Sequence, residues 1–230
     1  MYQLERVKET LMTEYMRQDG FYENVERIGV MPVVVLEKVE DAIPMGNALQ
    51  KGGLPAAEVT FRTSAAAECI HAIATNCPDV LVGAGTVLNI DQAKSAVDAG
   101  AKFIVSPGFD IEVVDWCLAN KVDVIPAGVT PTELTTLVNR GIEVTKFFPA
   151  GIYGGLKAID ALASVFVGHR FMPTGGVNAA NLRDYLTDKA IIAAGGTWMV
   201  KPALFQDGDF SEVERKSAEA AQMVREIRGL

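Results

Sequence analysis

The sequence has few cysteines and histidines. Its 230 residues include three cysteines, Cys69, Cys77 and Cys117, and two histidines. This odd, sparse and widely spaced set does not suggest a disulfide framework, and its spacing to the histidines does not match a zinc site. We therefore expect buried free thiols in a reducing cytoplasm, and neither a metal ion nor another cofactor.

The sequence also lacks long apolar runs and an excess of positive charge. No run approaches the roughly 18 apolar residues that a membrane span needs, and the first twenty residues carry charges throughout, unlike a secretory signal peptide. Asp and Glu number 29 against 21 Lys and Arg, which gives a net charge of −8 and argues against nucleic-acid binding. With 49% hydrophobic residues, the chain is not disordered either. We expect a cytoplasmic globular protein with small-molecule partners.

Eight short apolar runs recur along the chain, and each is followed by Gly, Pro, Thr or Ser. Such runs are typical of strands buried on both faces of a parallel sheet. They span residues 32–36, 56–59, 80–84, 103–106, 122–127, 143–148, 170–174 and 190–195. Helix-like segments lie between them, and the repeat of roughly 20–27 residues matches a strand–helix unit.

The alternation predicts one α/β domain over residues 1–230, folded as a (β/α)8 TIM barrel. Residues 1–30 are predicted to add an extra N-terminal helix. Thr130-Pro131 and Asn178 predict the starts of two barrel helices. In such a barrel the active site lies at the carboxyl ends of the strands, so the polar residues there are the candidates.

Lys146 is the first candidate, because it interrupts an apolar run just before Phe147 and Phe148. Burial in an apolar strand disfavours the charged form of a lysine, and the neutral amine is a nucleophile for carbonyl carbon. The alternative is a lysine that reaches solvent at the strand end or pairs with an acid. Taken alone, this residue favours the alternative.

Glu58 is the second candidate, a carboxylate within the apolar run 56–59. A carboxylate is unusual in such a place unless it is paired or serves as a general acid and base. Strand alternation puts Glu58, Thr60 and Arg62 on one face if the strand stays extended that far. An ion pair with Arg62 and a catalytic role are therefore equally open.

Two glycine-rich sequences at the ends of the seventh and eighth predicted strands are the third candidate. They are Thr174-Gly175-Gly176 and Gly195-Gly196-Thr197. Each is expected to lead into a helical stretch, the first beginning at Asn178. Backbone amides and helix N-termini there make an anion cradle, and the loops after strands seven and eight often hold phosphate in this fold. The sequence thus predicts a phosphate site.

Six segments in chain order carry a resemblance to one enzyme family. They are residues 58–63 (EVTFRT), 83–89 (GAGTVLN), 106–108 (SPG), 146–150 (KFFPA), 173–177 (PTGGV) and 195–198 (GGTW). With these motifs, the chain from about residue 25 onward resembles the 2-keto-3-deoxy-6-phosphogluconate (KDPG) and 4-hydroxy-2-oxoglutarate (KHG) aldolases. The resemblance implies a metal-free, homotrimeric class I aldolase of the Entner–Doudoroff pathway. It would cleave KDPG to pyruvate and glyceraldehyde 3-phosphate, and also KHG to pyruvate and glyoxylate.

The resemblance also implies roles for single residues. Lys146 would form the Schiff base, and Glu58 would transfer protons. The substrate-binding positions would be Arg62, Thr86, Pro107, Phe148, Thr174, Gly175, Gly176, Gly196 and Thr197. The chain departs from the family where Gly151-Ile152-Tyr153 replaces a stretch that often begins with Glu, and this bears on substrate preference.

Two other functions stay open on the residues alone. A phosphate-binding barrel isomerase or epimerase would use Glu58 as its base and Lys146 only as an electrophile, without a covalent intermediate. A sugar-phosphate-binding module would bind its ligand without turnover. The second function gives no reason for a lysine, a carboxylate and an arginine to share the barrel mouth, and a covalent amine adduct separates the first from an aldolase.

Overall fold

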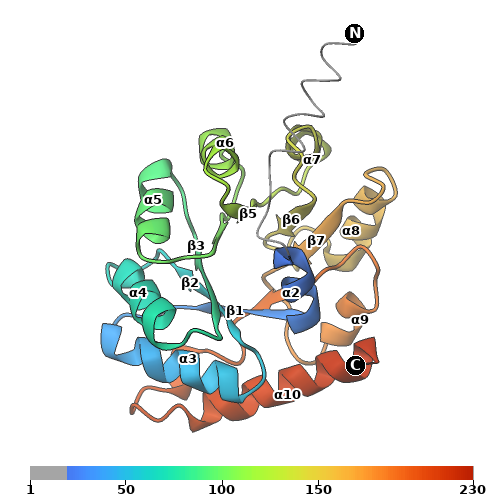
Figure 1. Ribbon diagram of the computed structural model, residues 1–230. Helices are drawn as coiled ribbons and strands as arrows, with labels where there is room; N and C mark the ends of the chain where they lie inside the picture. Colours follow the sequence, from blue (N-terminus) through green and yellow to red (C-terminus); the bar gives the residue numbers. More distant parts are fainter. Residues whose placement is uncertain (1–19, 230) are drawn as a thin grey trace.

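The computed structural model describes residues 20–229, in which strands and helices alternate along the chain (Figure 1). The strands are β1 (Val30–Val34), β2 (Ala56–Thr60), β3 (Leu81–Gly85), β4 (Phe103–Val105), β5 (Asp123–Ile125), β6 (Val144–Phe147), β7 (Arg170–Pro173) and β8 (Ala194–Gly196). The α-helices are α2 (Phe21–Ile28), α3 (Ala42–Lys51), α4 (Ala66–Asn76), α5 (Ile90–Asp98), α6 (Ile111–Ala119), α7 (Pro131–Val138), α8 (Gly155–Ala163), α9 (Leu182–Leu186) and α10 (Ser211–Arg228). Each predicted apolar run overlaps one of these strands.

The strands form two parallel sheets that meet at both edges. One sheet has the order β5-β4-β3-β2-β1-β8, and β6 pairs with β7 in the other. Isolated parallel bridges join Ala127, just after β5, to Lys146 of β6, and Thr174, just after β7, to Gly195 of β8. The predicted α/β class with parallel strands is therefore confirmed, and helices lie around the outside of the strands (Figure 1).

The amino ends of the strands are packed with aromatic rings. Gly83 of β3 leaves room for Phe103, because a Cβ at Gly83 would lie 2.5 Å from the Phe103 ring. Phe21 of α2 packs on the same ring, with 5.4 Å between centroids. Of the N-terminal helix predicted over residues 1–30, the part before residue 20 lies outside the described residues, and α2 occupies most of the rest.

Helix starts follow the sequence prediction at one place and differ at another. Thr130 and Glu133 form a reciprocal capping box at the start of α7, as the Thr-Pro sequence predicts. The helix predicted to begin at Asn178 begins at Leu182 instead. The Asn178 side chain accepts a hydrogen bond from the Ala180 amide at 2.9 Å, and this turn delays the helix.

The strand end at Gly196 also leads into irregular structure. A turn and the short 3-10 helix η2 (Pro202–Leu204) follow it, where a helical stretch was expected. The two glycine-rich ends therefore offer backbone groups rather than the N-terminus of a long helix.

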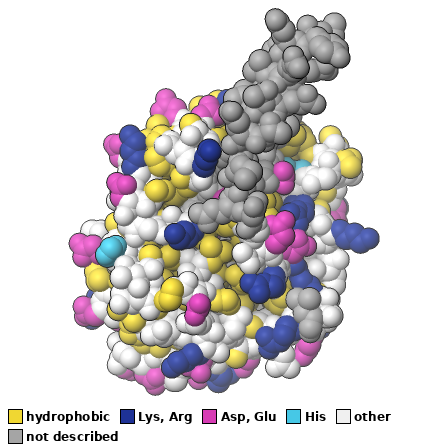
Figure 2. Space-filling view, in the orientation of Figure 1, with side chains coloured by type: hydrophobic (Ala, Val, Ile, Leu, Met, Phe, Trp, Pro, Cys, Tyr) yellow, Lys and Arg dark blue, Asp and Glu magenta, His cyan; other side chains and the backbone are white. Residues whose placement is uncertain are grey.

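The described residues hold neither a membrane-spanning helix nor a cluster suited to a metal ion. No helix in residues 20–229 is long and apolar enough to cross a bilayer, and no three His, Cys, Asp or Glu side chains there could share a metal. The three cysteines are free and buried, as expected. On the face shown in Figure 2, acidic and basic side chains are interspersed wherever the surface is coloured by residue type.

His169 is a buried histidine that joins β6 to the start of β7. Its Nε2 lies 2.7 Å from Oγ1 of Thr145, and its ring meets the edge of Phe171 at 5.2 Å between centroids. Burial lowers the pKa of His169 to about 4, although a hydrogen bond with the Ile142 backbone and the charge of Glu143 oppose the shift. The native protein thus holds this imidazole neutral.

We expect His169 to make stability fall in mild acid. Above about pH 6.5 both the native and the unfolded chain hold it neutral, and between pH 6.5 and 4 only the unfolded chain gains a proton. The free energy of unfolding should therefore drop by about 1.4 kcal/mol per pH unit in that window. Urea titrations at pH 7.5 and 5.5 measure this, and His169→Gln should lose this part of the pH dependence. An equal loss in His71→Asn, at an exposed position on α4, would contradict the assignment.

Candidate active site

A buried ion pair joins the two predicted catalytic residues. Lys146 Nζ on β6 donates a hydrogen bond to Glu58 Oε1 on β2 at 2.9 Å, and both side chains are buried. Because β2 and β6 belong to different sheets, the pair crosses the space that the strands enclose. The second carboxylate oxygen, Glu58 Oε2, is buried and has no hydrogen-bond partner among the described residues.

Glycine on the neighbouring strand makes room for this carboxylate. The parallel register pairs Thr60 of β2 with Gly85 of β3. A Cβ at Gly85 would lie 2.3 Å from Glu58 Oε1, closer than any side chain could approach without displacing the carboxylate. Sequence reasoning did not single out Gly85 as a site residue, although the Gly-Ala-Gly sequence of β3 was the available signal.

Phe148 forms a wall beside the lysine. Lys146 Nζ lies 5.5 Å from the centroid of the Phe148 ring, within the range of a cation–π contact. The preceding Phe147 is buried and packs on Phe171 at 6.4 Å between centroids. Phe148, a predicted substrate-binding position, therefore lies next to the lysine.

Arg62 is not the partner of Glu58. Its Nε donates a 3.2 Å hydrogen bond to Thr60 Oγ1, and the carboxylate pairs with Lys146 instead. Strand β2 ends at Thr60, so the extended conformation that the sequence argument required does not reach Arg62. The ion pair with Arg62, one of the two interpretations of Glu58 that the sequence left open, is therefore not formed.

Thr174 points a buried hydroxyl into tight space at the end of β7. Its Oγ1 has no hydrogen-bond partner among residues 20–229. A Cβ at Gly195 would lie 2.2 Å from that oxygen, so the glycine of β8 accommodates the threonine. An unpaired buried hydroxyl is costly, which suggests that it bonds to a molecule bound at the strand ends.

The turn after Thr174 is built from closely packed backbone. Gly175 and Gly176 both have φ near +90°, a conformation that favours glycine. The Gly175 carbonyl accepts from the Gly151 amide at 2.9 Å, and the Gly176 carbonyl accepts from Asn181 Nδ2 at 2.9 Å. A Cβ at Gly176 would lie 3.2 Å from Cα of Gly151, so this turn packs closely against the loop after β6.

The remaining predicted residues lie at the same ends of their strands. Thr86 follows β3 with φ of 57°, and Pro107 follows β4, and both are half-buried. Gly196 ends β8 beneath the Trp198 ring, and Thr197 is exposed. Within the described structure, these four residues form no hydrogen bond with Lys146 or Glu58.

The arrangement is suited to covalent chemistry on a carbonyl compound. A lysine amine that can pass its proton along a 2.9 Å hydrogen bond to a carboxylate becomes a nucleophile where water is excluded. The same carboxylate can then return the proton. The guanidinium of Arg62 lies after the end of β2, and such a group is suited to binding an anion.

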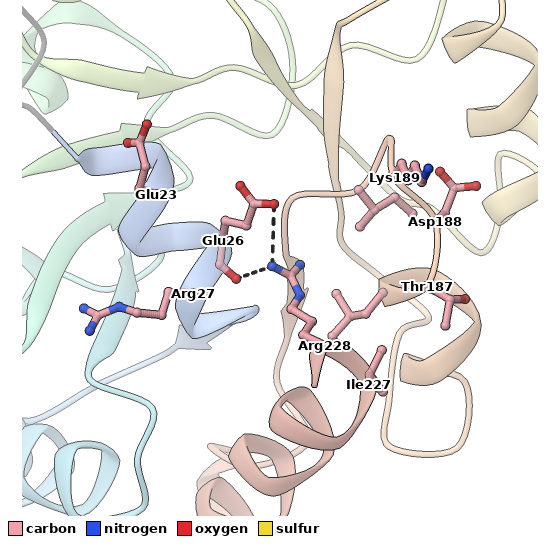
Figure 3. A pocket seen from close by; sticks show the side chains of 10 residues that line it. Glu23, Glu26, Arg27, Thr187, Asp188, Lys189, Ile227 and Arg228 are labelled. Atoms are coloured by element: carbon pink, nitrogen blue, oxygen red, sulfur yellow. Dashed lines mark hydrogen bonds and ion pairs between the residues drawn. The ribbon is translucent and has the colours of Figure 1, made fainter. Parts of the chain in front are cut away.

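A separate pocket of about 640 Å³ lies at the opposite, amino ends of the strands (Figure 3). It lies between α2, the loop that precedes β8 and the end of α10, and none of the predicted site residues lines it. Glu26 accepts from Arg170 at 2.8 Å, while Arg228 donates to the Glu26 and Ile192 carbonyls. The hydrogen bonds of Arg228 thus connect the end of α10 to α2 and to the segment before β8.

Comparison with known proteins identifies the family to which the chain is similar along most of its length. Residues 22–216 match the family model described as KDPG and KHG aldolase. The 2-dehydro-3-deoxy-phosphogluconate aldolase of Treponema pallidum is 48% identical over 88% of this chain and 97% of its own. The KHG/KDPG aldolase of Escherichia coli is 41% identical over 84% of this chain and 91% of its own.

Solved structures agree with this match. The KDPG aldolase of Legionella pneumophila, with pyruvate captured at low pH as a covalent carbinolamine intermediate, superposes with a TM-score of 0.83. It is 33% identical and covers 86% of this chain and 96% of its own. The Zymomonas mobilis KDPG aldolase with 3-phosphoglycerate has a TM-score of 0.81 at 36% identity, over 88% and 95% of the two chains.

The buried ion pair should respond to mutation as two coupled charges. Lys146→Met leaves Glu58 unpaired, so we expect a loss of about 3–5 kcal/mol in the free energy of unfolding. The double variant Lys146→Met, Glu58→Leu removes both charges and should recover most of that loss. Denaturant titrations measure the free energy of unfolding of the parent, the single variant and the double variant.

An exposed pair provides the control for this prediction. Arg215 and Glu212 lie 2.8 Å apart on the surface of α10. Arg215→Met should cost less than about 1 kcal/mol, because solvent screens an exposed pair. If Lys146→Met cost no more than Arg215→Met, the pair would not be held as a buried ion pair.

Proposed function

The chain belongs to the KDPG and KHG aldolase family, and from that premise we propose how its residues carry Schiff-base aldolase chemistry. Lys146 is the Schiff-base lysine and Glu58 its proton-transfer partner. The observation that carries this assignment is the 2.9 Å hydrogen bond between Lys146 Nζ and Glu58 Oε1, with both side chains buried. We propose KDPG as the main substrate and KHG as a second one.

The first half of the reaction forms the imine. Glu58 takes a proton from Lys146, and the amine attacks the C2 ketone of the substrate. Glu58 then returns the proton to the hydroxyl of the carbinolamine, which leaves as water. The resulting iminium withdraws electrons more strongly than the ketone did, so the bond between C3 and C4 is weakened.

The second half breaks the carbon–carbon bond. Glu58, directly or through one water, removes the proton of the C4 hydroxyl, and the C3–C4 electron pair moves toward the iminium. An aldehyde and the enamine of pyruvate result. Glu58 protonates C3, and water hydrolyses the imine to release pyruvate. One carboxylate is sufficient because the proton transfers occur in sequence.

The pyruvate half of the substrate lies near Arg62, Thr86, Pro107 and Phe148 in this proposal. Its carboxylate is only one bond from the imine carbon, so it must be bound near Lys146. Arg62 supplies the charge, and Thr86 a hydroxyl. The Phe148 ring, 5.5 Å from Lys146 Nζ, excludes water on one side.

The phosphate end lies at the ends of β7 and β8. Thr174 contacts the hydroxylated part of the substrate through its unpartnered buried hydroxyl. The backbone of Gly175, Gly176 and Gly196 and the exposed Thr197 hydroxyl receive the phosphate. Support comes from the left-handed turn at Gly175 and Gly176, whose carbonyls are both held by hydrogen bonds, which fixes the direction of the intervening peptide.

We also propose the wider setting implied by the family resemblance. Residues 1–230 form one domain, a closed eight-stranded barrel with an N-terminal helical extension, supported by the bridges that join the two sheets. The enzyme is a cytoplasmic homotrimer without a cofactor, in the carbohydrate metabolism of the Entner–Doudoroff pathway. Exposed apolar side chains, Ile152, Tyr153, Val165 and Val167, are candidates for the subunit interface.

Reductive trapping tests the nucleophile. Pyruvate with borohydride should add one reduced pyruvyl group to Lys146 and inactivate the enzyme, as measured by mass spectrometry of peptides. Lys146→Arg keeps the charge but cannot form the imine, so neither adduct nor activity should remain. Lys157→Arg, at an exposed position on α8, is the matched control and should behave as the parent. An adduct elsewhere, or none, would refute Schiff-base chemistry at Lys146, and the absence of any adduct would favour the isomerase.

Two further variants test which anion each end of the site binds. Thr197→Val should raise KM for KDPG by about 2- to 10-fold, the equivalent of one net hydrogen bond, and leave KHG cleavage almost unchanged. Arg62→Leu should impair both substrates, because both carry the keto-acid carboxylate. Measuring kcat/KM of both variants with both substrates tests these two assignments. Equal losses on KDPG and KHG for Thr197→Val would show that the phosphate lies elsewhere.

A further inference from the structure

Thr60 is a buried residue that lies between Glu58 and Arg62 in the sequence. The proposed reaction gives it no role. It ends β2, two residues after Glu58 and two before Arg62, and its side chain is buried. It does not contact the ion pair through any hydrogen bond among the described residues. Its hydroxyl nevertheless has two well-defined partners.

The direction of the Thr60 hydroxyl is fixed by those partners. Oγ1 donates its single proton to the Val34 carbonyl of β1 at 3.1 Å. The oxygen therefore presents a lone pair to Arg62, whose Nε–H donates to it at 3.2 Å. Because a hydroxyl has one proton, the bond to β1 determines that Thr60 acts as an acceptor toward the guanidinium.

The hydrogen bond from Arg62 to Thr60 restrains a side chain that the strand itself does not orient. The chain turns after Thr60, where the Phe61 amide bonds to the Gly85 carbonyl at 2.8 Å, so pleating no longer directs the Arg62 side chain. Arg62 is exposed, and a long exposed side chain samples many rotamers. The hydrogen bond from Nε is the contact that draws the guanidinium back toward the end of β2.

The same contact selects one edge of the guanidinium. Arginine can bind a carboxylate through Nε and one Nη, or through both Nη groups. With Nε bonded to Thr60, the edge formed by the two Nη groups is left for an anion. We propose, on the basis of the function proposed above, that Thr60 is a positioning residue that presents this edge of Arg62 to the carboxylate of the pyruvate half.

The test measures substrate affinity and turnover separately. Thr60→Val removes the hydroxyl at nearly constant volume, so KM for KDPG should rise about 2- to 10-fold while kcat stays within about 2-fold. The pyruvate concentration that gives half-maximal borohydride trapping should rise by the same factor. Thr60→Ser restores the hydroxyl and should restore both values.

A matched control lies three residues further along the chain. The Thr63 hydroxyl donates to the carbonyl of Leu36, in the segment after β1, at 2.6 Å, and it forms no hydrogen bond with the Arg62 side chain in the described structure. Thr63→Val therefore loses a comparable hydrogen bond and should leave KM and trapping unchanged. An equal rise in KM for Thr63→Val would assign the effect of Thr60→Val to general loosening, and would overturn the proposal.

A double-variant cycle completes the test. If Thr60 acts through Arg62, then Thr60→Val should have almost no further effect on KM in an Arg62→Leu background. Full additivity would overturn the proposal, as would unchanged KM in Thr60→Val alone. Should Thr60→Val fail to fold, Thr60→Ala carries the same expectations, because it removes the hydroxyl without adding an apolar methyl.

The outcome is separable from that of the proposed function. If the parent enzyme forms no pyruvate adduct at Lys146, then the Schiff-base assignment fails independently of anything observed at Thr60. If the parent forms the adduct and Thr60→Val traps pyruvate at the parent's concentration, then only the role of Thr60 fails.

Discussion

The ion pair between Lys146 and Glu58 is the interaction around which the rest of the site is arranged. It brings together two strands from different sheets and residues 88 apart in the sequence. Removing two charges from water is costly, and their attraction offsets that cost only at close range with good geometry. A pair of well-packed apolar residues would serve stability at least as well. The pair is therefore better explained by the proton it can move than by the stability it adds.

The neighbouring strands provide the space that such a pair requires. Glycines stand where a larger side chain would strike a functional one, Gly85 beside Glu58 and Gly195 beside Thr174. Gly195 is the bridge partner of Thr174, and Gly85 lies on β3 two residues beyond Gly83, the register partner of Glu58. The site is thus specified as much by missing side chains as by reactive ones, and its precision derives from rigid strands rather than from loops.

The strands follow from the sequence more directly than the contacts between distant side chains do. Periodic apolar runs identify the eight strands, because burial on both faces leaves a strong pattern. Lys146 and Glu58 are conspicuous for the same reason, as charges inside apolar runs. Which charge pairs with Glu58 depends on contacts between distant segments, and strand alternation pointed only to Arg62, whereas the partner is Lys146. The start of α9 differs for a local reason, since the Asn178 side chain forms a turn that competes with the helix.

The tryptophan at the end of β8 gives the enzyme an internal optical reporter. The Trp198 ring covers Gly196 so closely that a Cβ there would lie 1.9 Å from it, and the indole is only partly buried. Indole emission depends on the polarity and charge around the ring, and this ring adjoins the backbone assigned to phosphate. The other tryptophan, Trp116, belongs to α6. If phosphate binds there as proposed, fluorescence from position 198 follows the arrival of a phosphorylated substrate in real time, without labelling and before any bond is broken.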